Sequence, residues 1–383
     1  MTVYDKNYLI TLIINSMGGG GAERVTLSLA RELVASGYNI EIVIFKDNGK
    51  LLDEAKDIAP LFIIGSNRVA IILFLLTKYL INRTPKIIIS ALTLVNIVSI
   101  LALKLSFIKS KIIIVEHSAT YERSKLEKKT LKSRLIPILI KITYPMADVV
   151  AGVSEGVLQS LLYNYKIKPK RKTVLYNPID VEKFQNYSNL VFKTSQINHR
   201  GKEVPFFLAA GRLELVKDYS TLLKAFHELL KSHEAKLIIL GEGSLEQELK
   251  DFTIELGIQE HVSFPGFVTD IYSYMCNSDI FVLTSVYEGM PTVLLEAMAC
   301  GTPVISSNCP YGPNELIQDG VEGYLYPVGD YEQLAKLMRI LLNDKSKRSQ
   351  MGEHAYNRAT VFSIERSMSA YKREIEFLIK GER

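Results

Sequence analysis

The chain has 383 residues, of which 48% are hydrophobic and 23% are charged, which excludes a disordered or fibrous protein and is enough for two domain cores. Its three cysteines, Cys276, Cys300 and Cys309, have no CxxC or Cys/His spacing, which argues against a zinc site or a disulfide framework and fits reduced thiols in the cytoplasm. The start of the chain lacks a basic region followed by a small-residue cleavage site, so we do not expect secretion.

The charge is unevenly distributed along the chain. Residues 1–185 contain 26 Lys and Arg against 15 Asp and Glu, a net charge of +11, while the remainder has 20 against 26, a net charge of −6. A basic half indicates an anionic partner, which could be nucleic acid, a phosphorylated substrate or a membrane surface.

The first half alternates apolar runs with helical patterns. Short continuous apolar runs are typical of buried parallel strands, and a helical pattern at 21–37 ends at Gly37. This alternation predicts a doubly wound α/β domain. The apolar stretches 69–81 and 94–105 are too short to cross a membrane, and the second is typical of a buried helix. The predicted strands lie at 8–15, 39–45, 86–90, 111–117 and 148–154.

The same pattern restarts after a polar interval at 185–203, with a helix at 219–232, and predicts a second α/β domain. The last helix, at about 363–380, has no strand after it, so we expect it to return to the first domain. We therefore predict one domain from 1–180 with 363–383, and another from 181–362. The strands of the second domain are predicted at 205–211, 236–241, 261–266, 279–285, 302–307 and 323–327.

Four glycines, Gly18, Gly19, Gly20 and Gly21, separate the first strand from the first helix. Glycines let the backbone approach a ligand closely, and a helix N-terminus favours an anion. The loop has Glu23 where a dinucleotide fingerprint needs its third glycine, and it lacks the lysine of a phosphate loop, which disfavours a nicotinamide enzyme. The alternative is a tight turn without a ligand.

Two basic residues follow a strand of the second domain. Arg212 comes directly after Gly211 at the strand end, and Lys217 lies five residues later. Basic side chains at this end of a strand point into the crevice where open α/β sheets bind ligands, and a diphosphate would need such a pair. The alternative is solvated surface charge.

The segment "EGMPTVLLE" places Glu288 in a loop before a short helix that we expect to run from 292 to 299. Pro291 suits the start of this helix, and Gly301 ends it. Glu296 lies on an otherwise apolar helix, so its carboxylate needs hydroxyl donors or a cation, for which a vicinal diol is suited. The amides expected to face an anion are those of Gly289, Met290, Thr292 and Val293.

A basic segment at 121–145 places seven Lys and Arg beside an apolar run. This pattern predicts an interfacial segment attracted to anionic lipid head groups. The alternative is a solvated helix with one core face.

The second half of the chain resembles the signature of the retaining glycosyltransferases of family four. The resemblance lies in Arg212, Lys217, "EGMPTVLLE", "CGTPVISS" and "DGVEGYLYPVGD". The resemblance extends to the glycine-rich loop, to His117 and to "YNPID", and so covers nearly the whole chain. It implies the GT-B fold, in which two Rossmann-like domains face each other across a cleft. "SSNCPYGPNELI" also resembles members that build bacterial surface polysaccharides such as O-antigen or capsule.

The resemblance implies a role for each matching residue. Arg212 and Lys217 would hold the diphosphate of a nucleotide sugar, Glu296 the ribose hydroxyls and Glu288 the hydroxyls of the donor sugar. His117 would face that sugar from the first domain, and it completes a catalytic set with Arg212, Lys217 and Glu288. The other donor-binding residues would be Gly18, Gly19, Gly20 and Gly21 over the phosphates or the acceptor, Gly211, Gly289, Met290 and Pro291 along the sugar, Thr292 and Val293 at the phosphate, and Phe267 and Val268 at the base.

The implied reaction moves a hexose or N-acetylhexosamine from a UDP-sugar, with retention, to a polyprenyl-diphosphate-linked or free glycan. It needs no metal and no other cofactor, and it would take place in the cytoplasm at the inner face of the membrane. The alternatives are a nucleotide-sugar epimerase or a phosphorylase of the same fold. A nucleic-acid-binding protein is disfavoured, because the chain has no helix-turn-helix, RNP or zinc motif.

Overall fold

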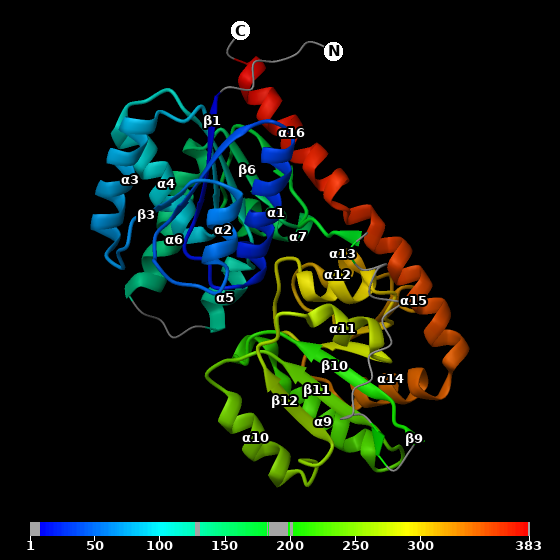
Figure 1. Ribbon diagram of the computed structural model, residues 1–383. Coiled ribbons are helices and arrows are strands. Elements are labelled where there is room, and N and C mark those ends of the chain that lie inside the picture. Colours follow the sequence, from blue (N-terminus) through cyan, green and yellow to red (C-terminus); the bar gives the residue numbers. More distant parts are fainter. Residues whose placement is uncertain (1–7, 127–130, 182, 184–197, 200–201, 382–383) are drawn as a thin grey trace. The chain divides into compact units, whose positions relative to one another are not determined.

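The computed structural model describes residues 8–126, 131–181, 183, 198–199 and 202–381 (Figure 1). Its backbone contacts divide the chain into two units, Met1–Pro178 with Ile364–Arg383, and Ile179–Ser363. These limits lie within two residues of the boundaries expected from the sequence. Residues 127–130 of the basic segment and most of the polar interval lie outside the described residues.

The first unit contains a sheet of seven parallel strands in the order β3-β2-β1-β4-β5-β6-β7. Every residue of β4 is buried, as expected for a strand covered by helices on both faces. The two edge strands, β3 and β7, were not predicted, because each has only three residues. The strands are β1 (Leu9–Ile14), β2 (Asn39–Ile44), β3 (Leu61–Ile63), β4 (Ile87–Ala91), β5 (Lys111–Glu116), β6 (Val149–Gly152) and β7 (Lys172–Val174).

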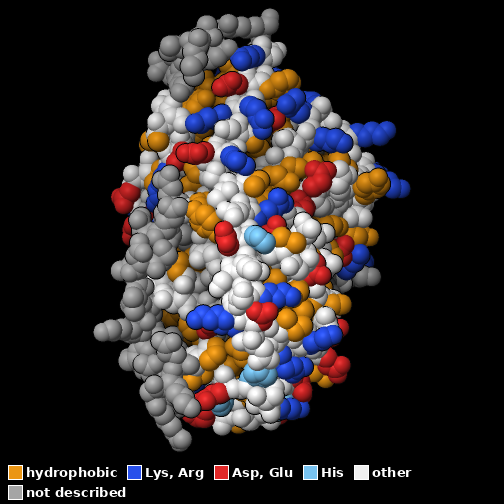
Figure 2. Space-filling model, turned by 90° about the vertical axis from the view of Figure 1, so that its right-hand side faces the viewer, with side chains coloured by type: hydrophobic (Ala, Val, Ile, Leu, Met, Phe, Trp, Pro, Cys, Tyr) orange, Lys and Arg blue, Asp and Glu red, His pale blue; other side chains and the backbone are white. Residues whose placement is uncertain are grey.

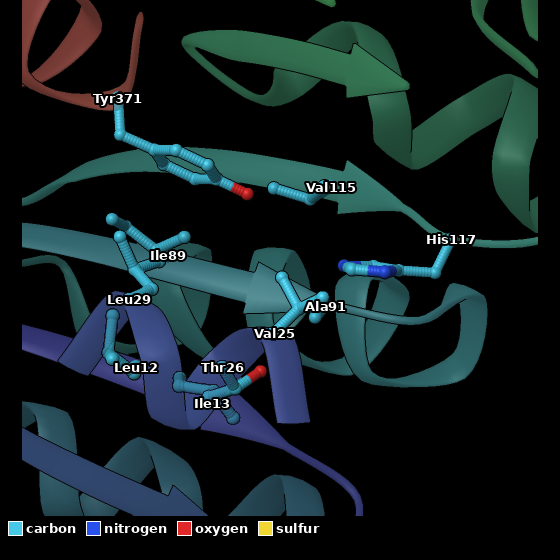
Figure 3. A pocket seen from close by; sticks show the side chains of 10 residues that line it. All are labelled: Leu12, Ile13, Val25, Thr26, Leu29, Ile89, Ala91, Val115, His117 and Tyr371. Carbon is cyan, nitrogen blue, oxygen red and sulfur yellow. The ribbon is translucent and has the colours of Figure 1, made fainter. Parts of the chain in front are cut away.

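Helices cover both faces of this sheet (Figure 1). Successive strand residues point to opposite faces, so Ile13 and Ile88 pack with the core of α3 and α4, whereas Leu12 and Ile89 face α1 and α16 (Figure 3). The helices are α1 (Gly21–Ala35), α2 (Leu52–Ile58), α3 (Val69–Arg83), α4 (Thr93–Ser106), α5 (Thr120–Leu126), α6 (Leu131–Thr143), η1 (Tyr144–Met146), α7 (Glu155–Asn164) and α16 (Ile364–Lys380).

The last helix, α16, belongs to the first unit although about 200 residues separate it from β7. Arg171, just before β7, donates to both carboxylate oxygens of Glu374 at 2.6 and 3.1 Å. Tyr371 of the same helix is 1% exposed and reaches over the sheet (Figure 3). A partly buried two-point ion pair and an aromatic side chain therefore fix the returning helix.

The second unit contains a sheet of six parallel strands in the order β12-β11-β10-β13-β14-β15. A short antiparallel pair, β8 (Asn198–His199) and β9 (Lys202–Glu203), precedes it. The strands of the main sheet are β10 (Phe206–Ala210), β11 (Lys236–Leu240), β12 (Val262–Gly266), β13 (Ile280–Leu283), β14 (Val304–Ser307) and β15 (Gly323–Tyr326). The helices are η2 (Leu215–Lys217), α9 (Tyr219–Leu230), α10 (Glu246–Glu255), α11 (Ile271–Asn277), α12 (Thr292–Ala299), α13 (Pro313–Leu316), α14 (Tyr331–Asn343), α15 (Lys345–Ala359) and η3 (Thr360–Phe362).

Both sheets have the doubly wound strand order, in which the chain starts at a central strand, moves to one edge and then resumes on the other side of its starting point. This reversal lies between β1 and β4 in the first unit and between β10 and β13 in the second. Ligands of such sheets bind outside the carboxyl ends of the strands at this point. Each unit thus has one preferred place for a site.

Candidate functional site

In the second unit, the carboxyl end of β10 places Lys217 and Arg212 at the reversal point. Gly211 has a φ of +153°, and a Cβ there would lie 3.0 Å from Lys217 Cε and 3.1 Å from Tyr219 Oη. Glycine is therefore needed for the lysine stem to pack against the strand end. Arg212 is exposed, and no carboxylate in the described part of the chain pairs with its guanidinium.

The side chain of Lys217 forms an ion pair with Glu288, which follows the neighbouring strand β13. Nζ lies 2.6 Å from Oε1, and each side chain is only 15% exposed. Ser285 donates to the same carboxylate oxygen at 2.6 Å, and Thr284 donates to the carbonyl of Lys217 at 2.6 Å. From the sequence we expected the lysine and the glutamate to contact different parts of a ligand, and this pair was not predicted.

The helix α12 begins beside this ion pair and matches the predicted range 292–299. Pro291 is its N-cap, and the Pro291 carbonyl accepts from Leu294 at 3.1 Å. The amides of Thr292 and Val293 have no acceptor in the part of the chain that the structure describes. Two free amides at the positive end of a helix favour an anionic ligand.

The two remaining expected amides, those of Gly289 and Met290, belong to buried residues that have interactions of their own within the chain. Glu296 is 8% exposed and lies just over one turn inside α12, and it also has an interaction within the chain. The structure thus places both carboxylates at the same helix start, with Glu288 before it and Glu296 within it.

The loop before α12 is held by the segment after β14. The amide of Glu288 donates to the carbonyl of Pro310 at 2.7 Å, and that of Tyr311 donates back to the carbonyl of Glu288 at 3.2 Å. Gly312 has a φ of +90°, and a Cβ there would lie 2.8 Å from the carbonyl oxygen of Gly289. In the sequence this segment carried only a resemblance, and its support of the site was not predicted.

Glycines also allow the ends of β11 and β12 to lie close to the end of β10. The amide of Gly241 donates to the carbonyl of Gly266 at 2.8 Å, and a Cβ on Gly241 would lie 2.0 Å from the carbonyl oxygen of Gly211. The ends of β12, β11 and β10 therefore lie close together. Phe267 and Val268, half-buried directly after β12, lie at the same sheet edge as the basic residues.

One buried hydroxyl at the site escaped the sequence analysis. Tyr219 is 4% exposed, and its hydroxyl has no hydrogen-bond partner among the described residues. Burial raises the pKa of Tyr219, and the negative charge of Glu288 raises it further, so the hydroxyl keeps its proton. A buried donor without a partner next to Gly211 is suited to an acceptor on a ligand. The sequence signal that could have indicated this hydroxyl is a tyrosine two residues after a predicted site lysine.

In the first unit, His117 follows β5, next to the reversal point. It lines a cavity of about 10 Å³, and burial lowers its pKa to about 4, so the imidazole is neutral near neutral pH (Figure 3). The preceding Glu116, which is 1% exposed, was not predicted as a site residue. It accepts from Tyr144 at 2.8 Å, Thr93 at 3.0 Å and Ser118 at 3.3 Å. Burial raises the pKa of Glu116, and these hydrogen bonds oppose that rise.

The glycine-rich loop leads into α1, for which Gly20 is the N-cap. Gly19 has a φ of +98°, which requires glycine. A Cβ on Gly20 would lie 2.8 Å from a carboxylate oxygen of Glu23. An anionic ligand would meet this carboxylate at the loop, whereas a sugar hydroxyl could donate to it.

Comparisons with known proteins agree with this architecture. A family model described as Glycosyltransferase Family 4 matches residues 19–183, and one described as Glycosyl transferases group 1 matches residues 191–358. A Campylobacter jejuni GalNAc-α-(1→4)-GalNAc-α-(1→3)-diNAcBac-PP-undecaprenol α-1,4-N-acetyl-D-galactosaminyltransferase is 30% identical over 93% of this chain and 94% of its own. Another transferase from C. jejuni, which adds N-acetylgalactosamine to an N-acetylgalactosamine-N,N'-diacetylbacillosaminyl-diphospho-undecaprenol, is 29% identical over 92% of this chain and 94% of its own.

Among solved structures, Anabaena HepE in complex with UDP-glucose has a TM-score of 0.83 and 18% identity, covering 97% of this chain and 100% of its own. A glycosyltransferase from Rickettsia africae has a TM-score of 0.81 and 19% identity, covering 98% of this chain and 100% of its own. Two doubly wound parallel sheets with these similarities define a glycosyltransferase of the GT-B fold. The chain belongs to glycosyltransferase family 4, and it is a hexosyltransferase, as the sequence predicted.

Proposed function

We propose that the protein transfers a hexose or N-acetylhexosamine from a UDP-sugar to a polyprenyl-diphosphate-linked glycan, with retention, in the synthesis of a bacterial surface polysaccharide. The observation that carries this proposal is the convergence of Arg212, Lys217 and the free α12 amides at the reversal point of the second sheet. The names of the two Campylobacter relatives, which act on undecaprenol-diphosphate glycans, support the acceptor, and the HepE complex supports the nucleotide.

The diphosphate is the part of the donor that this site suits best. Arg212 has no acidic partner in the described chain, and the amides of Thr292 and Val293 point out of a helix start. Together with Lys217 they offer positive charge where negative charge develops as UDP leaves. No metal is needed in this proposal, because the two side-chain cations fill that role.

The carboxylates hold hydroxyls on either side of the diphosphate. Glu296 accepts from the ribose, and Glu288, anchored by Ser285, accepts from the donor sugar. Gly211, Gly289, Met290 and Pro291 line the sugar, and Phe267 with Val268 flank the uracil.

Lys217 has two partners in this scheme. Its ammonium pairs with Glu288, so a bound diphosphate shares the ammonium with the carboxylate. Sharing keeps both charges compensated in a nearly buried place, where an unpaired charge is costly. The ion pair thus does not prevent Lys217 from binding a diphosphate.

The first unit offers groups that suit sugar hydroxyls. A neutral His117 can accept a hydrogen bond or donate one to a sugar hydroxyl without adding charge. Because the carboxylate of Glu23 lies against Gly20, we assign the loop Gly18–Gly21 to the hydroxyl-bearing acceptor rather than to the phosphates.

The test is a nucleotide-release assay over UDP-, GDP- and ADP-sugars, with and without a polyprenyl-diphosphate-linked glycan. We expect UDP release that depends on the acceptor, with the product keeping the anomeric configuration of the donor by NMR. Lys217→Ala should lower turnover roughly 100-fold, whereas Lys250→Ala, which removes a half-exposed lysine of α10, should not. Isomerisation of the donor without acceptor would indicate an epimerase, phosphate-dependent sugar release a phosphorylase, and an inverted product would refute retention.

A further inference from the structure

Three helices, α3, α4 and α6, cover one face of the first sheet side by side (Figure 1). Their inward side chains form one core, but their outward sides expose large apolar residues. Phe74 is 66% exposed, Ile142 is 59% exposed, and Phe107, directly after α4, is 91% exposed. The apolar face defined here consists of Ile71, Phe74, Ile81, Leu105, Phe107, Leu135, Ile138 and Ile142.

The charged residues of α3, α4 and α6 that the structure describes are all basic. The chain has no Asp or Glu between Ile58 and Val115, and none in α6. The helices of the opposite layer differ, because α1 and α16 carry both acidic and basic residues, and the side of the molecule that includes α16 shows both signs interspersed (Figure 2). The exposed basic residues beside the apolar face are Lys78, Lys104, Lys109, Arg134 and Lys141.

A hollow of about 520 Å³ opens next to α3 at the edge of the sheet. Leu61, Phe62 and Leu75 form its apolar wall, and Lys78 lies at its rim. Arg83, which also lines the hollow, pairs with the buried Glu41, whereas Lys78 has no acidic partner among the described residues. The hollow therefore combines an apolar wall with one uncompensated cation.

We propose that the α3–α4–α6 face docks on a lipid bilayer that contains anionic phospholipids. The apolar side chains would lie between the head groups and the acyl chains, and the basic residues would contact the phosphates. Stable interfacial binding takes two signals, buried apolar area and a basic patch, and this face has both. Exposed apolar side chains gathered on one face with basic neighbours mark an interaction site rather than an ordinary surface.

The charge pattern selects a bilayer over a second copy of the chain. Two such faces brought together would place like charges opposite one another, which is unfavourable. An anionic bilayer complements every one of the five basic residues without requiring a matching shape. The surface extends beyond the segment 121–145 that the sequence predicted, because it includes α3 and the turn at Phe107.

This inference deepens the proposed function, since a bilayer would also hold a lipid-linked acceptor. Docking would confine the enzyme to the two-dimensional layer in which that acceptor diffuses and so raise its effective concentration. The binding test does not depend on catalysis.

The test is co-sedimentation of the full-length protein with vesicles of phosphatidylcholine alone or with phosphatidylglycerol added. One variant combines Phe74→Ser with Phe107→Ser, and a second combines Lys78→Gln with Lys104→Gln. The control combines Val34→Ser on α1 with Arg373→Gln on α16, which are exposed residues of the opposite layer. All the changes lie at exposed positions, so unchanged melting temperatures will verify folding.

We expect the wild type to sediment with phosphatidylglycerol vesicles and less with phosphatidylcholine alone. The phenylalanine variant should lose at least roughly tenfold in partitioning on both. The lysine variant should lose roughly 30-fold on the anionic vesicles and little on the neutral ones. A wild type that stays in solution with both kinds of vesicle, or a control that loses as much as the face variants, would overturn the proposal.

An activity assay separates this inference from the proposed function. The face variants should keep the wild-type rate with a short-chain, water-soluble acceptor and lose activity only with an acceptor embedded in vesicles. Equal loss with both acceptors would contradict the docking role. If no acceptor is used by any form, the proposed function fails, while the sedimentation result still decides the docking surface.

Discussion

Removing Glu288 should destabilise the second unit far more than removing a half-exposed glutamate in an ion pair of the same length. The Lys217–Glu288 pair and the Lys250–Glu246 pair both have 2.6 Å between nitrogen and oxygen. Their exposure differs, because the first pair is 15% exposed on each side and the second is 43% and 35% exposed. The comparison therefore sets a nearly buried pair between two segments against a half-exposed pair within one helix.

The expected cost follows from that exposure. Glu288→Ala would leave the Lys217 ammonium nearly buried without its partner, for which we expect a loss of about 3 kcal/mol, near the lower end for a broken buried pair because some solvent reaches it. Glu246→Ala should cost less than about 1 kcal/mol, since solvent screens this half-exposed pair. In a double-mutant cycle with Lys217→Met, the two losses at the buried pair should not add, because the second change removes the charge that the first left unpaired.

Native-state hydrogen exchange in the amides of β10 and β13 is the suitable assay, because it reports the opening free energy of the second unit separately from the first. A coupling energy at Lys217–Glu288 no larger than that at Lys250–Glu246 would refute the argument.

Three further predictions concern single sites. Glu288→Gln removes a negative charge beside the diphosphate position, so the affinity for UDP should rise about fivefold or more while turnover falls. Calorimetry and a turnover assay measure the two effects, and weaker UDP binding would contradict the prediction. In the folded protein His117 has a pKa of about 4, against an ordinary value of 6.5, so the unfolded chain is protonated at this residue first as pH falls. The free energy of unfolding of the first unit should therefore decrease by up to about 3 kcal/mol between about pH 6.5 and about pH 4. Urea unfolding of His117→Gln should show a flatter pH profile, and an unchanged profile would contradict the assignment. Cys276 and Cys300, with sulfurs 2.8 Å apart, should pass two electrons and two protons to diamide and form a disulfide, while the buried Cys309 stays a thiol. After alkylation, mass spectrometry should show a label on Cys309 only, because the other two cysteines are held in the disulfide. Labels on all three cysteines would contradict the geometry.

The sequence predicted the fold well because parallel strands covered on both faces consist of continuous apolar runs. Eleven strands were predicted, most of them from such runs, and each corresponds to a strand of the structure. The edge strands β3 and β7 escaped because they are short and, as at the exposed Phe62, only half covered. The last helix could be assigned to the first unit because no strand follows it.

The site was predictable in residue types but not in contacts. The ion pair joins residues 71 positions apart, and only the adjacency of β10 and β13 brings them together. Glu116 ends an apolar run and could have been noticed there, but its three hydroxyl partners come from separate segments. The outward side of α3 was not readable, because the stretch 69–81 is apolar nearly all round, and packing alone decides which of its residues face the core.

Calorimetric titration with UDP tests the central claim most directly, because the account places the diphosphate of the donor at Arg212 and Lys217. UDP should bind the wild type and the Lys250→Ala control equally, and it should bind Arg212→Ala and Lys217→Ala at least roughly tenfold more weakly, the effect of losing a charge-assisted contact to phosphate. Absence of UDP binding to the wild type, or equal affinity in all four proteins, would contradict the account.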